Sequence, residues 1–179
     1  MRSILRGAAA ATLALAIGAA PAFAANPGAR PGDATIVDIV VAPDGEFDVL
    51  QAAVIEAGLA GALSSPDVQY TVFAPTDAAF VSTFRAILGD NTLTESDVIA
   101  FIDAGGVDSA LGDGALANVL LFHVTNGRRT AMSVVRAPQY RMLNGDRLTR
   151  TQLFGAGIVA TVISASNGVI HVIGSVLIP

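Results

Sequence analysis

Apolar residues follow two different spacings along the chain, and each spacing predicts a type of secondary structure. Helical spacing is clearest early in the chain, at Phe47, Leu50, Val54 and Leu59. Residues 68–73 instead form a short run of β-branched and aromatic side chains, which is typical of a buried strand. Residues 35–41 are also apolar, but their periodicity fits a strand or an opening helix equally well. The pattern therefore predicts a chain that mixes helices with strands.

The segment YTVFAPTDAAF, residues 70–80, predicts a sharp corner between a strand and a helix. Pro75 removes a backbone donor and holds Ala74 in an extended conformation. Thr76 or Asp77 can then accept hydrogen bonds from the free amides of a following helix. That helix is expected to run through Phe80, Phe84 and Leu88. A nucleophile elbow needs Gly-x-Ser-x-Gly at such a corner, so we interpret this one as a fold feature.

Caps and turns divide the rest of the chain into further elements. Asp44 is a plausible cap for the helix near Phe47, and Thr94-Glu95-Ser96-Asp97 is a second cap that opens a helix through Ile102. Another helix is expected from about Ala115 into Phe122-His123. Asn-Gly pairs, which are strong turn signals, occur at residues 126–127, 144–145 and 167–168. The last of these pairs predicts a hairpin within residues 156–179.

The N-terminus has the features of an export signal. Residues 1–24 combine two early arginines, an Ala-rich apolar run, a proline break and the cleavage-type ending Ala22-Phe23-Ala24. A retained membrane anchor is the alternative, but an Ala-rich run is only weakly hydrophobic. We therefore predict a cleaved signal peptide over 1–24, a Pro/Gly linker over 25–34 and one domain over 35–179. After cleavage we expect no membrane span and a secreted protein, either periplasmic or extracellular.

Charge and cysteine content exclude several classes of function. The net charge of −5 argues against a nucleic-acid partner, because phosphate binding needs a clustered basic face. The absence of cysteine excludes disulfides and thiol chemistry. The charges are unevenly distributed, since six arginines follow residue 120 against Asp146 alone. We favour the interpretation that the two halves neutralise each other in the fold. The alternative is a basic face that meets an acidic partner, formed by Arg128, Arg129, Arg136, Arg141, Arg147 and Arg150.

No pattern in the sequence predicts catalytic, cofactor-binding or metal-binding residues, so we expect a protein without cofactor that is not an enzyme. The two histidines, His123 and His171, lack a readable third metal ligand. We predict that His171 is a satisfied, half-buried strand residue and that His123 bonds the loop near Pro75. Asp44, Glu46 and Asp48 alternate like a calcium loop, but Val49 and Ile55 occupy the required Gly and Glu positions. Two G-x-G-x-x-A matches lack the context of a dinucleotide site.

Three segments together resemble the fasciclin domain family. TVFAPTDAAF at residues 71–80 is similar to the family's first signature box, LLFHVTNG at 120–127 to its central Tyr-His box, and NGVIHVIGSVLIP at 167–179 to its closing box. The resemblance covers about residues 35–179. It departs at Phe122, where the family usually has Tyr, and at Gly174, near which the family usually has Asp. We expect the fold to survive both departures.

The resemblance implies an α+β fold, a bent pair of β-sheets flanked by several α-helices. The matched positions that it marks as structural are Thr71, Pro75, Thr76, Asp77, Phe80, His123, Gly127, Asn144, Gly145, His171 and Pro179. Because the family's Tyr-His region is implicated in adhesion, a candidate interaction face comprises Phe122, His123, Arg128 and Arg129. The missing hydroxyl of Phe122 puts that role in question.

The implied function is a secreted, non-enzymatic interaction module in adhesion or matrix binding. Its partner would be a cell-surface or matrix protein, a polysaccharide, or another copy of itself. An alternative comes from the high aliphatic content of the chain. A core of Val, Ile, Leu and Ala could leave a pocket that carries a small apolar ligand such as a lipid.

Overall fold

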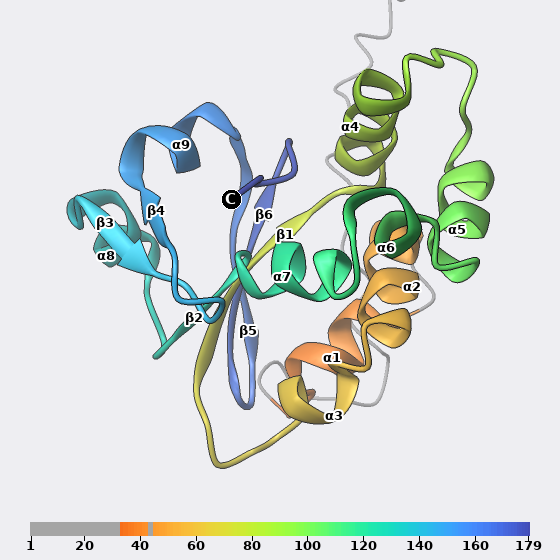
Figure 1. The fold of residues 1–179 in the computed structure, drawn as a ribbon. Coiled ribbons are helices and arrows are strands. Elements are labelled where there is room, and N and C mark those ends of the chain that lie inside the picture. Colours follow the sequence, from red (N-terminus) through yellow and green to blue (C-terminus); the bar gives the residue numbers. More distant parts are fainter. Residues whose placement is uncertain (1–32, 43–44) are drawn as a thin grey trace, which may run out of the picture.

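The structure is a computed structural model that describes residues 33–42 and 45–179. The predicted signal peptide over 1–24, most of the predicted linker and the predicted cap Asp44 lie outside the described residues. Within the described residues the fold is a mixture of helices with two sheets (Figure 1). The predicted fold class, α+β with a pair of sheets flanked by helices, is confirmed.

A four-stranded sheet in the order β2-β1-β6-β5 lies at the centre of the molecule. Strand β1 pairs in parallel with β6, with Val72 opposite Ile170, and antiparallel with β2. The predicted C-terminal hairpin is confirmed as the antiparallel pair of β5 and β6. The sheet thus brings together the three segments quoted above, although they lie far apart in the sequence. Its strands are β1 (Tyr70–Pro75), β2 (Val124–Asn126), β5 (Ile158–Ala165) and β6 (Gly168–Ile173).

A smaller unit, which we call the ribbon lobe, occupies residues 131–155. It contains α8 (Ala131–Arg136), β3 (Gln139–Arg141), β4 (Arg147–Thr149) and α9 (Arg150–Gly155). The predicted Asn144-Gly145 turn joins the two strands, and Gly145 has a φ of 97°, which glycine adopts without a steric penalty. In Figure 1 the ribbon lobe lies on the opposite side of the sheet from α2, α4 and α5.

Most helices begin at the side-chain caps that the sequence contains. Thr76 Oγ1 accepts a hydrogen bond from the Ala79 amide, and capping boxes open helices at Thr35 and Thr94. Segment 35–41, for which the sequence left helix and strand open, is a helix that begins at the Thr35 capping box. The helices before β2 are α1 (Ile36–Val40), α2 (Asp48–Glu56), α3 (Ala60–Leu63), α4 (Asp77–Leu88), α5 (Glu95–Asp103), α6 (Gly106–Leu111) and α7 (Ala115–Leu121).

Among the described residues, the buried apolar side chains form two clusters, one toward each side of the sheet. The larger cluster joins the helices to one side and includes Phe47, Leu50, Phe80, Ile102 and Leu120. The smaller cluster, which we call the ribbon cluster, joins the sheet to the ribbon lobe; it comprises Phe73, Phe122, Val134, Tyr140, Met142, Leu148, Leu153, Ala156, Ile173 and Leu177. The sheet therefore separates a helical side from a ribbon side.

Candidate functional site

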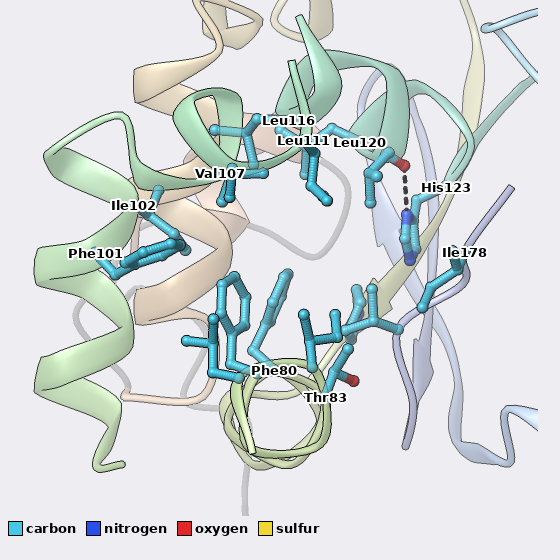
Figure 2. Close-up of a pocket in the computed structure, with 17 residues that line it drawn as sticks. Phe80, Thr83, Phe101, Ile102, Val107, Leu111, Leu116, Leu120, His123 and Ile178 are labelled. Carbon is cyan, nitrogen blue, oxygen red and sulfur yellow. Dashed lines mark hydrogen bonds between the residues drawn. The ribbon is translucent and has the colours of Figure 1, made fainter. Parts of the chain in front are cut away.

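A cavity of about 110 Å³ opens on the helical side, between α4, α5, α6, α7 and the C-terminal tail (Figure 2). Its apolar rim includes side chains that are between 45% and 63% exposed, namely Ile87, Leu88, Leu111 and Ile178. Its wall is lined by Pro75, Phe80, Thr83, Phe84, Phe101, Ile102, Val107, Ala110, Leu116, Val119, Leu120, His123 and Val176. Open apolar hollows of this kind are the usual shape of a small-molecule or anchor site.

The polar side chains in this wall have their hydrogen bonds made within the protein. The Thr83 hydroxyl donates to the Ala79 carbonyl at 2.8 Å, which is a bond within α4. Both ring nitrogens of His123 are also engaged, as described next. A ligand in the cavity would therefore find no free side-chain donor among these groups, and the Thr83 hydroxyl oxygen is the one acceptor that they leave. The arrangement favours an occupant that is itself apolar, because a polar group would lose its water without compensation.

His123 connects helix α7 to the C-terminal tail. Its Nδ1 lies 2.8 Å from the Val119 carbonyl, a contact shown by the dashed line in Figure 2. Its Nε2 accepts a hydrogen bond from the Leu177 amide at 2.9 Å. These two partners fix the neutral tautomer with the proton on Nδ1. Burial lowers the pKa of His123 to about 4, against the weaker opposing effect of the Val119 bond.

The predicted hydrogen bond from the His123 side chain to the loop near Pro75 was wrong. The ring bonds the Val119 carbonyl and the tail instead, and the backbone carbonyl of His123 accepts from the Phe73 amide of the first strand at 2.9 Å. Because Val176 and Ile178 flank Leu177 and line the cavity, the ring holds one wall of the cavity in place.

The predicted interaction face is divided between the interior and the surface. Phe122 and His123 are each only 2% exposed, so neither side chain stands on an outer face, and His123 can meet a partner only as part of the cavity wall. Phe122 belongs to the ribbon cluster, where an apolar ring needs no hydroxyl partner. Arg128 is exposed and donates to the Ala165 carbonyl at 3.0 Å. Arg129 lies with its guanidinium carbon 5.5 Å from the centre of the Tyr140 ring.

The prediction of a satisfied, half-buried His171 needs correction. The side chain is fully buried, and it stacks on Phe73 with ring centroids 5.7 Å apart. Its Nε2 lies 3.0 Å from the Arg129 carbonyl, whereas Nδ1 has no hydrogen-bond partner among residues 33–42 and 45–179. Burial lowers the pKa of His171, and the bond to the Arg129 carbonyl opposes this shift. The residue is therefore neutral in the folded core but only half satisfied.

Asp77 caps a helix other than its own. Thr76 caps α4, while the Asp77 carboxylate accepts from the amides of Asp48 at 3.1 Å and Val49 at 2.9 Å, at the start of α2. Oxygens of Asp48, Asp77 and Glu95 lie within 4.8 Å of one another. Burial raises the pKa of Asp77 to about 6, the two amides oppose the rise, and the neighbouring carboxylates add to it. The first motif thus ties α4 to α2.

The remaining predicted structural residues serve turns and strand contacts. Thr71 donates to the Gly127 carbonyl at 2.6 Å and accepts from the Arg129 amide at 2.9 Å. Gly127 has a φ of 87°, and Asn144 accepts from the Asp146 amide in its turn. Pro75 and Phe80 line the cavity, and Pro179 is exposed. At the second family departure, the Gly174 amide donates to the carbonyls of Ala156 and Gly157.

Sequence reasoning missed the role of Asn167. Its turn was predicted, but its side chain is fully buried and crosslinks distant segments. Its amide oxygen accepts from the Ile36 amide at 2.8 Å, and its amide nitrogen donates to the Leu63 carbonyl at 2.7 Å. The Asn-Gly pair predicts the turn, but it gives no information about hydrogen-bond partners that lie 104 and 131 residues away.

The interpretation that the two halves of the chain neutralise each other stays a prediction, and it does not rest on direct ion pairs of the late arginines. Within residues 33–42 and 45–179, none of the six arginines that follow residue 120 forms an ion pair with a carboxylate. Arg85, which precedes them, bonds the Leu93 carbonyl. Among the described residues, none of the helices has both the length and the apolar character needed to cross a bilayer.

Comparison with known proteins assigns the family. Residues 45–179 match the fasciclin domain, so the chain belongs to the fasciclin domain family, as its three motifs predicted. It is 34% identical to Protein sll1483 of Synechocystis sp. over 154 residues, covering 81% of this chain and 73% of that protein. It is 30% identical to the transforming growth factor-beta-induced protein ig-h3 of Sus scrofa, covering 81% of this chain but only 19% of that protein.

A solved structure shows the same fold. A FAS1 domain pair from the insect cell adhesion molecule Fasciclin I superposes with a TM-score of 0.54 at 13% sequence identity. The match covers 83% of this chain and 52% of that one. At this identity the likeness concerns the fold, and the ligand must be argued from the site itself.

Proposed function

We propose that the protein is a non-catalytic binding module whose cavity between α4 and α7 receives the apolar part of a partner. The observation behind this proposal is an open hollow of about 110 Å³ whose polar wall groups are internally satisfied. Its family includes adhesion-related proteins, and its family is generally non-enzymatic. The N-terminal sequence supports export to the periplasm or cell exterior as part of the proposal.

The size of the cavity limits what can enter it. An apolar cavity of about 150 Å³ can hold benzene, so this slightly smaller hollow suits one ring or a short aliphatic segment. The exposed rim residues Ile87, Leu111 and Ile178 extend the apolar surface beyond the mouth. In an adhesive complex the occupant is an anchoring side chain of a protein partner, because such anchors bury a central apolar group within a larger contact.

Blocking the mouth tests the proposal. Ala110 lies on α6, lines the cavity and is exposed, so Ala110→Phe should fill the mouth without disturbing the core. Ala100→Phe is the matched control on the exposed surface of α5, away from the lining. Titration with benzene, followed by methyl NMR, should shift Val107, Leu116 and Leu120 in the wild type and in Ala100→Phe, but not in Ala110→Phe. Equal shifts in all three proteins would reject the cavity as the site.

A second candidate function, carriage of a free apolar small molecule, is favoured by the same cavity. The two functions differ in what the protein contains when it leaves the cell. A carrier purified from exporting cells should have a native mass that exceeds the chain by one small molecule, and denaturation should remove the excess. An interaction module should show the mass of the chain or a multiple of it, and Ala110→Phe should weaken partner binding.

A further inference from the structure

The outer face of the β3–β4 ribbon places two positive charges side by side. Arg141 and Arg147 are directly opposite each other in the antiparallel register, and both are exposed. Their neighbours Tyr140 and Leu148 are buried on the other face, in the ribbon cluster. Directly opposed side chains in such a pair are about 5 Å apart at Cβ, so the two guanidinium groups share one surface.

This pairing is not matched by a direct ion pair within the described residues. Neither Arg141 nor Arg147 has a carboxylate partner there, and the adjacent Asp146 is bonded by the Asn144 side-chain amide at 2.8 Å. Like charges directly opposite in a strand pair are destabilising. The fold therefore tolerates a local repulsion that Gln at either position would relieve. A placement that works against stability points to a role outside folding.

Two further arginines surround the same ribbon. Arg150 follows β4, and its amide bonds the Pro138 carbonyl at 3.0 Å. Arg129 packs beside Tyr140 on the inner face of the ribbon. The positive charges thus come from both faces of a narrow element, while the whole chain has a net charge of −5. An anionic partner would be attracted to this strip and repelled by much of the remaining surface.

We infer that the β3–β4 ribbon binds an acidic polysaccharide through the carboxylates of its sugar units. Guanidinium forks bind carboxylates through paired hydrogen bonds, and Gln139 on the same outer face adds a neutral group for hydroxyls. The outer residues of the two strands, Gln139, Arg141, Arg147 and Thr149, include no aromatic ring for base stacking and no aliphatic side chain for insertion into lipid. A flexible polysaccharide chain can lie along the ribbon without contacting the acidic surface of the rest of the molecule.

Polygalacturonate is the test polymer, with uncharged dextran and vesicles containing anionic phospholipid as the comparison. Wild type should bind polygalacturonate, bind dextran not at all, and bind the vesicles more weakly than the polymer. Arg141→Gln/Arg147→Gln should weaken polymer binding about tenfold at low salt. Arg136→Gln removes an exposed arginine at the end of α8, outside the ribbon, and should change binding by about twofold at most.

Two measurements distinguish polymer recognition by Arg141 and Arg147 from an effect of these arginines on the fold. Arg141→Lys/Arg147→Lys keeps the charge but not the fork, so its affinity should lie between wild type and the double Gln variant. The melting temperature of the double Gln variant should equal or exceed that of wild type, because the repulsion is relieved. Unchanged polymer binding in the double Gln variant, an equal loss in Arg136→Gln, or a preference for vesicles would overturn the inference. Because Ala110→Phe leaves the ribbon intact, this result is independent of the cavity.

Discussion

The two sides of the central sheet use their side chains in different ways. On the helical side, α4 to α7 leave an open apolar hollow whose polar wall groups are already bonded. On the ribbon side, apolar residues form a closed cluster around Phe73 and Phe122. Arginines that form no ion pair with a carboxylate of the described part of the chain lie on the outer surface. The same sheet thus supports one surface suited to apolar contact and one suited to anions. The loosely packed helical side is therefore suited to an apolar group, and the closely packed ribbon side is suited to an anion on its outer surface.

Truncation of one phenylalanine on each side gives the largest expected effect. Phe122→Ala should lower the free energy of unfolding by about 3–5 kcal/mol, because a ring only 2% exposed leaves a cavity in the ribbon cluster. Phe84→Ala should cost roughly half as much, since its ring is partly exposed and already borders the hollow. Urea denaturation measures both values. Equal losses would show that the two sides are packed alike.

The two buried histidines allow the hydrogen bonds of the two sides to be compared through the stability lost when each ring is replaced. His123→Leu leaves the Leu177 amide unpaired and should cost about 2–4 kcal/mol. His171→Leu leaves the Arg129 carbonyl unpaired but also removes the unpartnered Nδ1, so its cost should be only about 0–2 kcal/mol. Thermal and chemical unfolding of the two variants give the ranking. A larger loss for His171→Leu would indicate that Nδ1 has a partner in solution.

The dependence of stability on pH should be the smallest of these effects, because the lowered pKa values of the two histidines and the raised pKa of Asp77 act in opposite directions. The pKa values of His123 and His171 are lowered in the folded state, so their contribution to stability is complete above the unfolded value of about 6.5 and is lost as the pH falls. For His123 this loss extends down to a pH of about 4. The pKa of Asp77 is raised to about 6, so its contribution is present at low pH and is lost as the pH rises through that value.

We expect wild type to lose stability between about pH 7 and pH 4.5, because the lowered pKa values of two histidines act against the raised pKa of one carboxyl group. His123→Leu should flatten this dependence and Asp77→Asn should steepen it. Melting temperatures measured across the range test both slopes, and Glu56→Gln, which removes an exposed carboxylate outside the Asp77 cluster, is the control. If melting temperature changed less steeply with pH in Asp77→Asn than in wild type, Asp77 would not be the group that opposes the histidines.

Local signals in the sequence predicted the secondary structure around the site well. Pro75 and Thr76 fixed the strand-to-helix corner, the Thr94 capping box placed α5, and Asn144-Gly145 placed the ribbon turn. Each signal works through backbone geometry or through a bond to an amide three residues away, so neighbouring residues suffice. For segment 35–41, apolar periodicity alone left helix and strand open, although the deciding Thr35-Asp38 box was present in the sequence.

Side-chain partners across the fold could not be predicted in the same way. His123 was expected near Pro75 but bonds Leu177, 54 residues later. Thr76 or Asp77 was expected to cap the following helix, and Thr76 does so, whereas Asp77 caps α2. Asn167 was expected in a turn, and its side chain also joins distant segments. These bonds depend on the relative placement of distant elements, which no local pattern encodes.

The sequence by itself determined the family, the mixture of helices and strands, and the uneven division of charge, because motif order, periodicity and composition are properties of the chain. Only the tertiary structure decided that Phe122 and His123 are interior and that a cavity remains between α4 and α7. It also decided that Arg141 lies opposite Arg147, with no ion pair to a carboxylate of the described residues. Burial, open volume and charge pairing arise when distant segments are brought together, so they belong to the packed domain and not to any one segment.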